Sequence, residues 1–293
     1  MKQRIALAFP VLMVAAAYLL LGAVNPVWAL AMLSAGLAFG SAAAIVAARR
    51  MYFLSAAAPH AALLAAAAGA LASASVGGDP YIWTAALGLM LVYGVGYAIH
   101  RGVDPDAATS VFVSLTASLS VMALYIAYTR TPAEVNIAGL VAGDPLLASR
   151  SEAVAAAVAG AASLGAVLLS YTEHVCIGLD PATARVAGIR TWVYDLIAFT
   201  VIGLSASIMI RVVGFVLEHV LVLLPASAAV TLSASAIGVL YLSLVLSLAG
   251  AASGLYLSLA LNVPPAGGAG LVLLAAYLAA LAYRRAVHGG QKG

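Results

Sequence analysis

Hydrophobic residues fill long stretches of the chain, and polar residues gather in the short segments between them. A helix needs about 20 mostly apolar residues to cross the hydrocarbon core of a bilayer. The stretches that meet this requirement are 5–24, 27–48, 53–73, 81–99, 107–128, 153–171, 191–210, 235–260 and 267–285. The pattern predicts an all-α, polytopic transmembrane helical bundle with about 8–10 membrane segments.

One further apolar stretch, 213–231, is interrupted by Glu218 and His219. An ionisable side chain at the bilayer centre costs about 2.5–3.5 kcal/mol on insertion scales, so such residues usually face a cavity, a pathway or each other. Gly214 before the pair and Pro225 after it favour a broken or short helix, a recurrent device in transporters. The alternative is a position near the outer interface within reach of water, because Arg211 lies shortly before the pair.

Composition supports a membrane protein. Hydrophobic residues make up 65% of the 293 residues and charged residues only 8%, whereas soluble proteins have about 25% charged residues. The loops are short, so residues 1–293 are expected to form a single transmembrane domain, without a cleavable signal peptide. The single Cys176 excludes an internal disulfide framework. The sequence has no nucleotide-binding P-loop, so any work done by ATP requires a partner chain, and no nucleic-acid partner is expected.

Lysines and arginines indicate the orientation. If the N-terminus is cytoplasmic and ten segments alternate, ten of the 13 lysines and arginines fall inside, and only Arg130, Arg150 and Arg211 lie outside or at the outer edge. Cytoplasmic loops of membrane proteins carry an excess of these residues. We therefore expect a multi-pass plasma-membrane protein with both termini in the cytoplasm.

Two Asp-Pro pairs have the signature of a helix start, because Asp is a good N-cap and Pro is favoured at the first helical position. Asp104-Pro105 precedes a predicted span. Asp180-Pro181 predicts a short helix in a cytoplasmic loop, which Gly188 can end. Such a helix either offers a binding surface to another protein or only caps the loop.

Two groups of residues carry metal-binding side chains. Glu173, His174 and Cys176 lie close together, but at a solvated helix end and without a fourth ligand at a recognisable spacing, so no metal site is expected there. His60 lies within a predicted span after Pro59, which bends a helix. His60 either faces a pathway or is a neutral imidazole that bonds a neighbouring carbonyl group.

Several short motifs occur in the order typical of one family of membrane proteins. The matching residues are Arg49-Arg50-Met51 with His60; Asp180, Ala184 and Gly188; Val213-Gly214 with Leu224-Pro225-Ala226; and Gly254-Leu255 with Ser258, followed by Pro264-Pro265-Ala266-Gly267. Over about residues 30–285, the chain resembles the permease subunit of bacterial and archaeal ABC importers for zinc, manganese or iron ions, which have a type II importer fold.

The resemblance implies a transport subunit rather than an enzyme. A second permease copy would form the translocation path with this chain, and an outer metal-binding protein would deliver the ion. Cytoplasmic ABC ATPase subunits would dock on the inner face at Asp180, Ala184 and Gly188, with the loop after Pro225 as a further docking candidate. ATP would then drive alternating access. The divalent metal ion would be cargo, and no permanently bound cofactor is expected.

The chain departs from the family pattern in three places: before His60, near Val230, where the usual arginine is missing, and at Glu218 and His219, where the family has apolar or hydroxyl-bearing residues. The family has Gly-Asp one helical turn before the histidine, and here Ser55-Ala56 stands in its place. We hypothesise that Glu218 replaces the lost carboxylate and that His219 or His60 supplies nitrogen to the metal pathway. A set of imidazole and carboxylate ligands suits zinc, manganese or iron(II).

Two other functions compete with this interpretation. A permease for a metal chelate, such as a siderophore or corrinoid, would have a wider and less charged cavity. A membrane-embedded metalloprotease would need a His-Glu-x-x-His site within a span, and the sequence contains no such motif.

Overall fold

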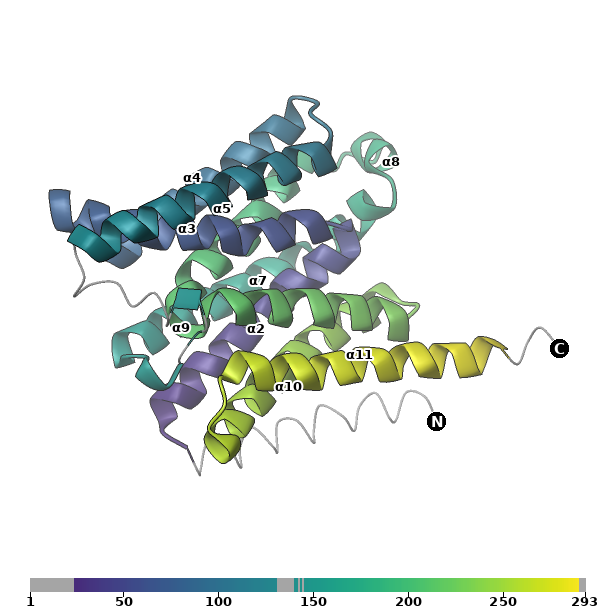
Figure 1. Ribbon diagram of the computed structural model, residues 1–293. Coiled ribbons are helices and arrows are strands. Elements are labelled where there is room, and N and C mark those ends of the chain that lie inside the picture. Colours follow the sequence, from purple (N-terminus) through teal and green to yellow (C-terminus); the bar gives the residue numbers. More distant parts are fainter. Residues whose placement is uncertain (1–23, 131–139, 142, 144, 290–293) are drawn as a thin grey trace.

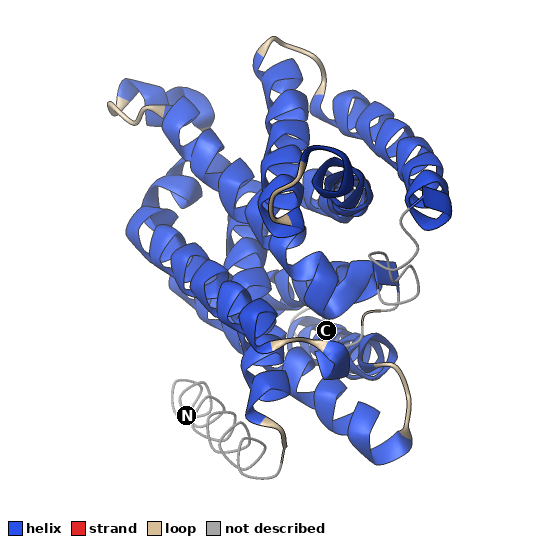
Figure 2. Ribbon diagram, turned by 90° about the vertical axis from the view of Figure 1, so that its left-hand side faces the viewer, coloured by secondary structure: helices blue, strands red, loops and turns tan. Residues whose placement is uncertain are grey.

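The computed structural model describes residues 24–130, 140–141, 143 and 145–289. The described residues form a helical bundle without β-strands (Figures 1 and 2). The helices are α2 (Pro26–Arg49), α3 (Tyr52–Val76), α4 (Pro80–His100), α5 (Pro105–Arg130), α7 (Arg150–Leu179), α8 (Pro181–Val186), α9 (Thr191–Leu232), α10 (Ala236–Leu261) and α11 (Pro265–Gly289), with a short 3-10 helix η1 (Pro145–Leu147). The predicted span 5–24 lies outside the described residues, except for its last residue.

The predicted membrane segments are confirmed within this part of the chain. Eight of the described helices are long and apolar enough to cross a bilayer. Helix α9 contains 42 residues, about twice the length that one crossing needs. It includes both of the predicted segments 191–210 and 213–231.

Helix α9 is broken at Gly214, where φ is 73° and ψ is 167°. This backbone conformation is essentially restricted to glycine. The start of α9 follows α8, and in Figure 1 the turn between α9 and α10 also lies on the side of α8 and the C-terminal end. The chain therefore reverses direction at Gly214, which confirms the predicted break. Gly143 packs on the break, because a Cβ atom added there would lie 1.8 Å from the carbonyl oxygen of Val213.

Helix α2 lies at the centre of one half of the bundle and packs against α7, α9 and α10. Small residues make this close approach possible. A Cβ atom added at Gly40 would lie 2.9 Å from the Leu244 Cα atom, and one added at Gly36 would lie 3.0 Å from the Leu248 Cα atom. Helix α3 packs instead against α4, α5 and α9, so α9 contacts both halves.

Pro225 lies inside the second half of α9 without ending it. A proline has no N–H group, so the carbonyl group of Leu221 loses the donor that a regular helix would provide. The hydroxyl group of Ser247 on α10 donates to this carbonyl oxygen at 2.9 Å. The replacement satisfies a backbone acceptor that has no access to water in lipid.

Candidate functional site

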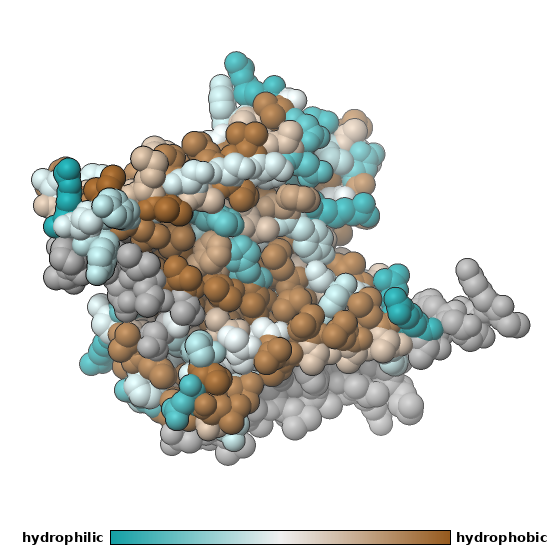
Figure 3. Space-filling model, viewed as in Figure 1, coloured by the Kyte–Doolittle hydropathy of each residue, from teal (hydrophilic) through white to brown (hydrophobic). Residues whose placement is uncertain are grey.

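Two histidines that are far apart in the sequence meet between α3 and the second half of α9. The ring centroids of His60 and His219 are 5.8 Å apart and the rings are edge to face, with an interplanar angle of 83°. Phe215 contacts both rings, with centroid distances of 4.8 Å to His60 and 4.7 Å to His219. Both histidines are partly exposed. Figure 3 shows hydrophilic colour between α3 and α9 on a face that is otherwise largely apolar.

Both ring nitrogens of His219 face backbone carbonyl oxygens, and the neutral imidazole donates its single N–H to one of them. Its Nδ1 atom lies 2.9 Å from the carbonyl oxygen of Phe215, and its Nε2 atom lies 3.1 Å from that of Ala56. A metal ligand needs a nitrogen lone pair that points at the ion. His219 therefore has to turn before it can bind a metal. The His60 ring makes no hydrogen bond to any described residue, so its nitrogens are not engaged by that part of the protein.

Glu218 is buried, unlike the two histidines. Adjacent residues diverge by about 100° around a helix, and Glu218 is only 1% exposed whereas His219 is partly exposed. Neither carboxylate oxygen has a hydrogen-bond partner among the described residues. The burial excludes the alternative in which water at the outer interface solvates this side chain. Among the described residues, no three histidine, cysteine or acidic side chains are close enough to hold a metal ion, so the structure brings His60 and His219 together without Glu218.

The predicted short helix after Asp180 is α8. The Asp180 side chain accepts a hydrogen bond from the Ala182 N–H group at 2.9 Å and another from the Thr183 hydroxyl group. These bonds, the Thr183 bond foremost, hold the pKa of Asp180 below its usual value. Gly188 follows the helix with a φ of 87°.

The side chains on α8 divide into two groups. Ala184 is only 3% exposed, so it contacts the bundle rather than offering a surface to a partner. Val186 is 90% exposed, and Arg185 beside it is also exposed. Of the three residues in the sequence motif, Asp180 and Gly188 are exposed at the two ends of α8, and Ala184 is buried against the bundle.

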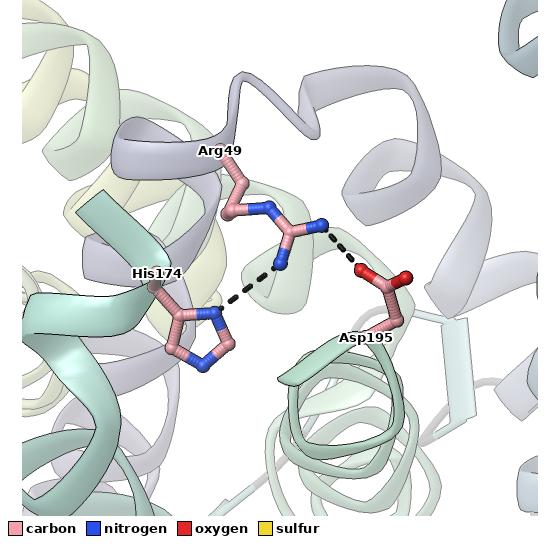
Figure 4. Close-up of polar contacts among 3 residues, drawn as sticks. All are labelled: Arg49, His174 and Asp195. Atoms are coloured by element: carbon pink, nitrogen blue, oxygen red, sulfur yellow. Dashed lines mark hydrogen bonds and ion pairs between the residues drawn. The ribbon is translucent and has the colours of Figure 1, made fainter. Parts of the chain in front are cut away.

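A polar cluster that the sequence did not predict joins α2, α7 and α9 near α8 (Figure 4). The Arg49 guanidinium forms an ion pair with Asp195 and lies 3.4 Å from the Nδ1 atom of His174. His174 is fully buried rather than solvated, which corrects the expectation for this helix end, whereas Cys176 is exposed. His174 and Asp195 are 125 and 146 positions from Arg49, so no local signal relates them.

Comparison with known proteins identifies relatives of this chain. It is 24% identical over 201 residues to a probable iron transport system membrane protein from Haemophilus influenzae, a match that covers 68% of this chain and 72% of that protein. It is 25% identical over 153 residues to the manganese transport system membrane protein MntB from Synechocystis, covering 52% of this chain and 50% of that protein.

The fold also has a solved counterpart. The structure of PsaBC from Streptococcus pneumoniae in complex with Fab matches with a TM-score of 0.75 and 18% identity, covering 91% of this chain and 95% of the matched chain. This similarity confirms the all-α, polytopic bundle. The model of the ABC 3 transport family matches residues 22–284. Since this match includes most of the sequence, the chain belongs to the ABC 3 transport family, as its motifs indicated.

Proposed function

We propose that this protein is the membrane permease subunit of an ATP-driven importer for a divalent metal ion. The observation that supports this most directly is the meeting of His60 and His219 between α3 and α9, which places two metal-binding side chains on a partly exposed face of a membrane bundle. The family assignment and the iron and manganese transport named for two relatives support the same function.

The end of the bundle that bears α8 is proposed to face the cytoplasm. Among the described residues, seven arginines lie at this end and three at the opposite end. The seven are Arg49, Arg50, Arg101, Arg185, Arg190, Arg284 and Arg285. This distribution agrees with the excess of positive charge in cytoplasmic loops, and it supports cytoplasmic termini.

Three partners complete the proposed importer. A cytoplasmic ABC ATPase subunit would dock on α8. Asp180 caps the start of this helix and Gly188 follows its end, Ala184 packs against the bundle, and Val186 is exposed. An outer metal-binding protein would deliver the ion to the opposite end. A second permease copy would face the partly exposed histidines. Two imidazoles do not fill the coordination shell of a transition metal, and a second copy would supply two more nitrogen ligands.

We propose that the metal pathway includes His60, His219 and Glu218. His60 would meet the ion first, because its ring is not held by hydrogen bonds to described residues. Glu218 is buried without a hydrogen-bond partner among those residues. Burial of an ionisable group within the membrane costs free energy, so residues of this kind usually have a function. A cation passing between the helices would compensate a carboxylate there. The combination of imidazole and carboxylate favours zinc, manganese or iron(II).

Transport assays distinguish this function from chelate import. The permease would be purified with its ATPase partner and placed in liposomes, and uptake of free Mn²⁺, Fe²⁺ and Zn²⁺ would be compared with uptake of a ferric siderophore and a corrinoid. We expect ATP-dependent uptake of at least one free ion. Uptake of a chelate alone would reject the proposal. If the complex transports a free ion but Glu218→Gln does so at the wild-type rate, Glu218 lies outside the pathway.

A further inference from the structure

The polar cluster of Arg49, His174 and Asp195 joins α2, α7 and α9 (Figure 4), and α8 lies between α7 and α9 in the chain. Arg49 is in the last turn of α2, and Asp195 is near the start of α9. A cation near a helix C-terminus and an anion near an N-terminus are both stabilised by the helix dipoles. The Arg49 side chain is 12% exposed and that of Asp195 is 31% exposed. The arginine end of the ion pair is therefore largely shielded from solvent, and the aspartate end is partly exposed.

The cluster holds the two helices that are connected through α8. His174 lies on α7, which ends just before α8, and Asp195 lies on α9, which begins just after it. The backbone reinforces this connection, because a Cβ atom added at Gly178 would lie 1.9 Å from the carbonyl oxygen of Ala48. The end of α2 thus contacts α7, which precedes α8 in the chain, and forms an ion pair with α9, which follows α8.

The same cluster is close in the chain to the histidine pair. Only Arg50 and Met51 separate α2 from α3, and Arg50 adopts a left-handed conformation that turns the chain sharply. Helix α3 carries His60, and the helix that bears Asp195 carries His219 beyond its break. Helix α8 contacts α7 and α9, and Arg49 links both of these helices to the end of α2, which leads directly into α3.

The hydrogen bonding of His174 is incomplete in this arrangement of the cluster. The Nδ1 atom of His174 accepts from Arg49. The opposite Nε2 atom is buried without a hydrogen-bond partner among the described residues. Buried donors without partners are uncommon because they have lost their bonds to water. A different relative position of α2, α7 and α9 would relieve this unsatisfied group.

We propose that Arg49, His174 and Asp195 together form a coupling clasp. The clasp transmits movement of α8 to the helices that carry His60 and His219. This inference rests on the proposed function, in which the ATPase docks on α8. Arg49 is a positioning residue in this account, since it contacts neither ATP nor the metal ion. Its planar guanidinium bonds two partners at once, which a lysine ammonium group does not reproduce with the same geometry.

The test compares metal uptake with ATP hydrolysis in the same liposomes that contain the permease and its ATPase. For Arg49→Lys and Asp195→Asn, we expect the amount of assembled complex to be retained and the number of ions imported per ATP to fall by about fivefold or more, the lower range of coupling effects between sites. The double variant Arg49→Asp with Asp195→Arg exchanges the two charges, and it should recover part of the wild-type number of ions imported per ATP. Arg101→Lys is the control, because Arg101 lies at the same end of the bundle but stacks over Tyr97 of α4, the helix that it caps, with 5.6 Å between its Cζ atom and the ring centroid.

A second measurement uses the single cysteine of the chain. Cys176 is exposed and lies two positions beyond His174. In the wild-type complex, we expect the rate at which a maleimide labels the permease to change when ATP is added, and in Arg49→Lys we expect this change to be lost. This readout reports movement of α7, which a purely structural ion pair would not control.

The outcomes separate the clasp from the function on which it rests. If wild-type liposomes show no ATP-dependent uptake of a free metal ion, the proposed function fails, and the clasp fails with it. If the wild-type complex is coupled and Arg49→Lys and Asp195→Asn keep the same ions per ATP and the same nucleotide-dependent labelling, the clasp alone is rejected.

Discussion

The Nε2 atom of His219 lies 3.1 Å from the carbonyl oxygen of Ala56. Ala56 is the position at which the resemblance places a carboxylate, one helical turn before His60. The structure therefore puts an imidazole from α9 beside the place where a family member would have an acidic side chain on α3. His219 and Ala56 are in contact, although they lie 163 positions apart in the chain.

Ala56→Asp should restore a carboxylate on the same face of α3 as His60, because residues four apart on a helix are neighbours. Ala56 is partly exposed, so the new side chain has room beside the histidine pair. We expect tighter Mn²⁺ binding to the purified permease, by about tenfold for a gain near 1.4 kcal/mol, measured by isothermal titration calorimetry. Ala56→Asn has the same size without the charge and serves as the control. Equal affinities for the two variants would contradict a metal site here.

His60→Ala and His219→Ala should affect transport to different extents. His60 has a ring without hydrogen bonds to described residues, so its loss should reduce ATP-dependent metal uptake most. The ring nitrogens of His219 face two carbonyl oxygens and must turn before they bind an ion, so loss of His219 should reduce uptake less than loss of His60. His100→Ala, at the exposed end of α4, is the control. Uptake by His60→Ala at the rate of this control would exclude His60 from the pathway.

Gly214→Ala should destabilise the protein, because the backbone at this break is in a region that residues with a Cβ atom rarely adopt. Strain of this kind costs about 1–3 kcal/mol. We expect a lower midpoint of thermal unfolding in detergent. Gly94→Ala is the matched control, since a Cβ atom added at Gly94 in helix α4 meets nothing within 4 Å. An alanine inside a helix is favoured over glycine by about 1 kcal/mol, so this control should be neutral or stabilising. Equal midpoints for the two variants would show that the break relaxes without strain.

Ser247→Ala should destabilise the bundle by leaving the Leu221 carbonyl group without its donor. Interhelical hydrogen bonds in membranes contribute about 0.6 kcal/mol on average, and at most about 1.7 kcal/mol. The cost should shrink in a Pro225→Ala background, where the new N–H group supplies the missing bond within the helix. A double-mutant cycle of unfolding free energies in detergent measures this coupling. An unchanged cost in both backgrounds would mean that Ser247 contributes through packing rather than through this bond.

Much of the fold could be predicted from the sequence because the signals that determine it are local. The length of each apolar stretch predicts a crossing. Asp180 with Pro181 predicts the start of α8, and Gly214 predicts the break in α9. Each of these signals depends on hydrophobicity, capping or backbone conformation within a few residues, so no knowledge of neighbouring helices is needed. The family motifs add the expected function, because they occur in the right order along the chain.

The tertiary structure decided which of the candidate residues meet. The sequence presented Glu218 and His219 as a pair, but the packing of α9 buries Glu218 and leaves His219 beside His60. It presented His174 with Glu173 and Cys176, but the packing of α2 against α7 directs His174 to Arg49. The physical reason is that these helices are apolar on nearly every side, so hydrophobic periodicity does not reveal which face each helix buries. That choice depends on close contacts between small residues such as Gly40 and the backbone of another helix, which exist only once the bundle has formed.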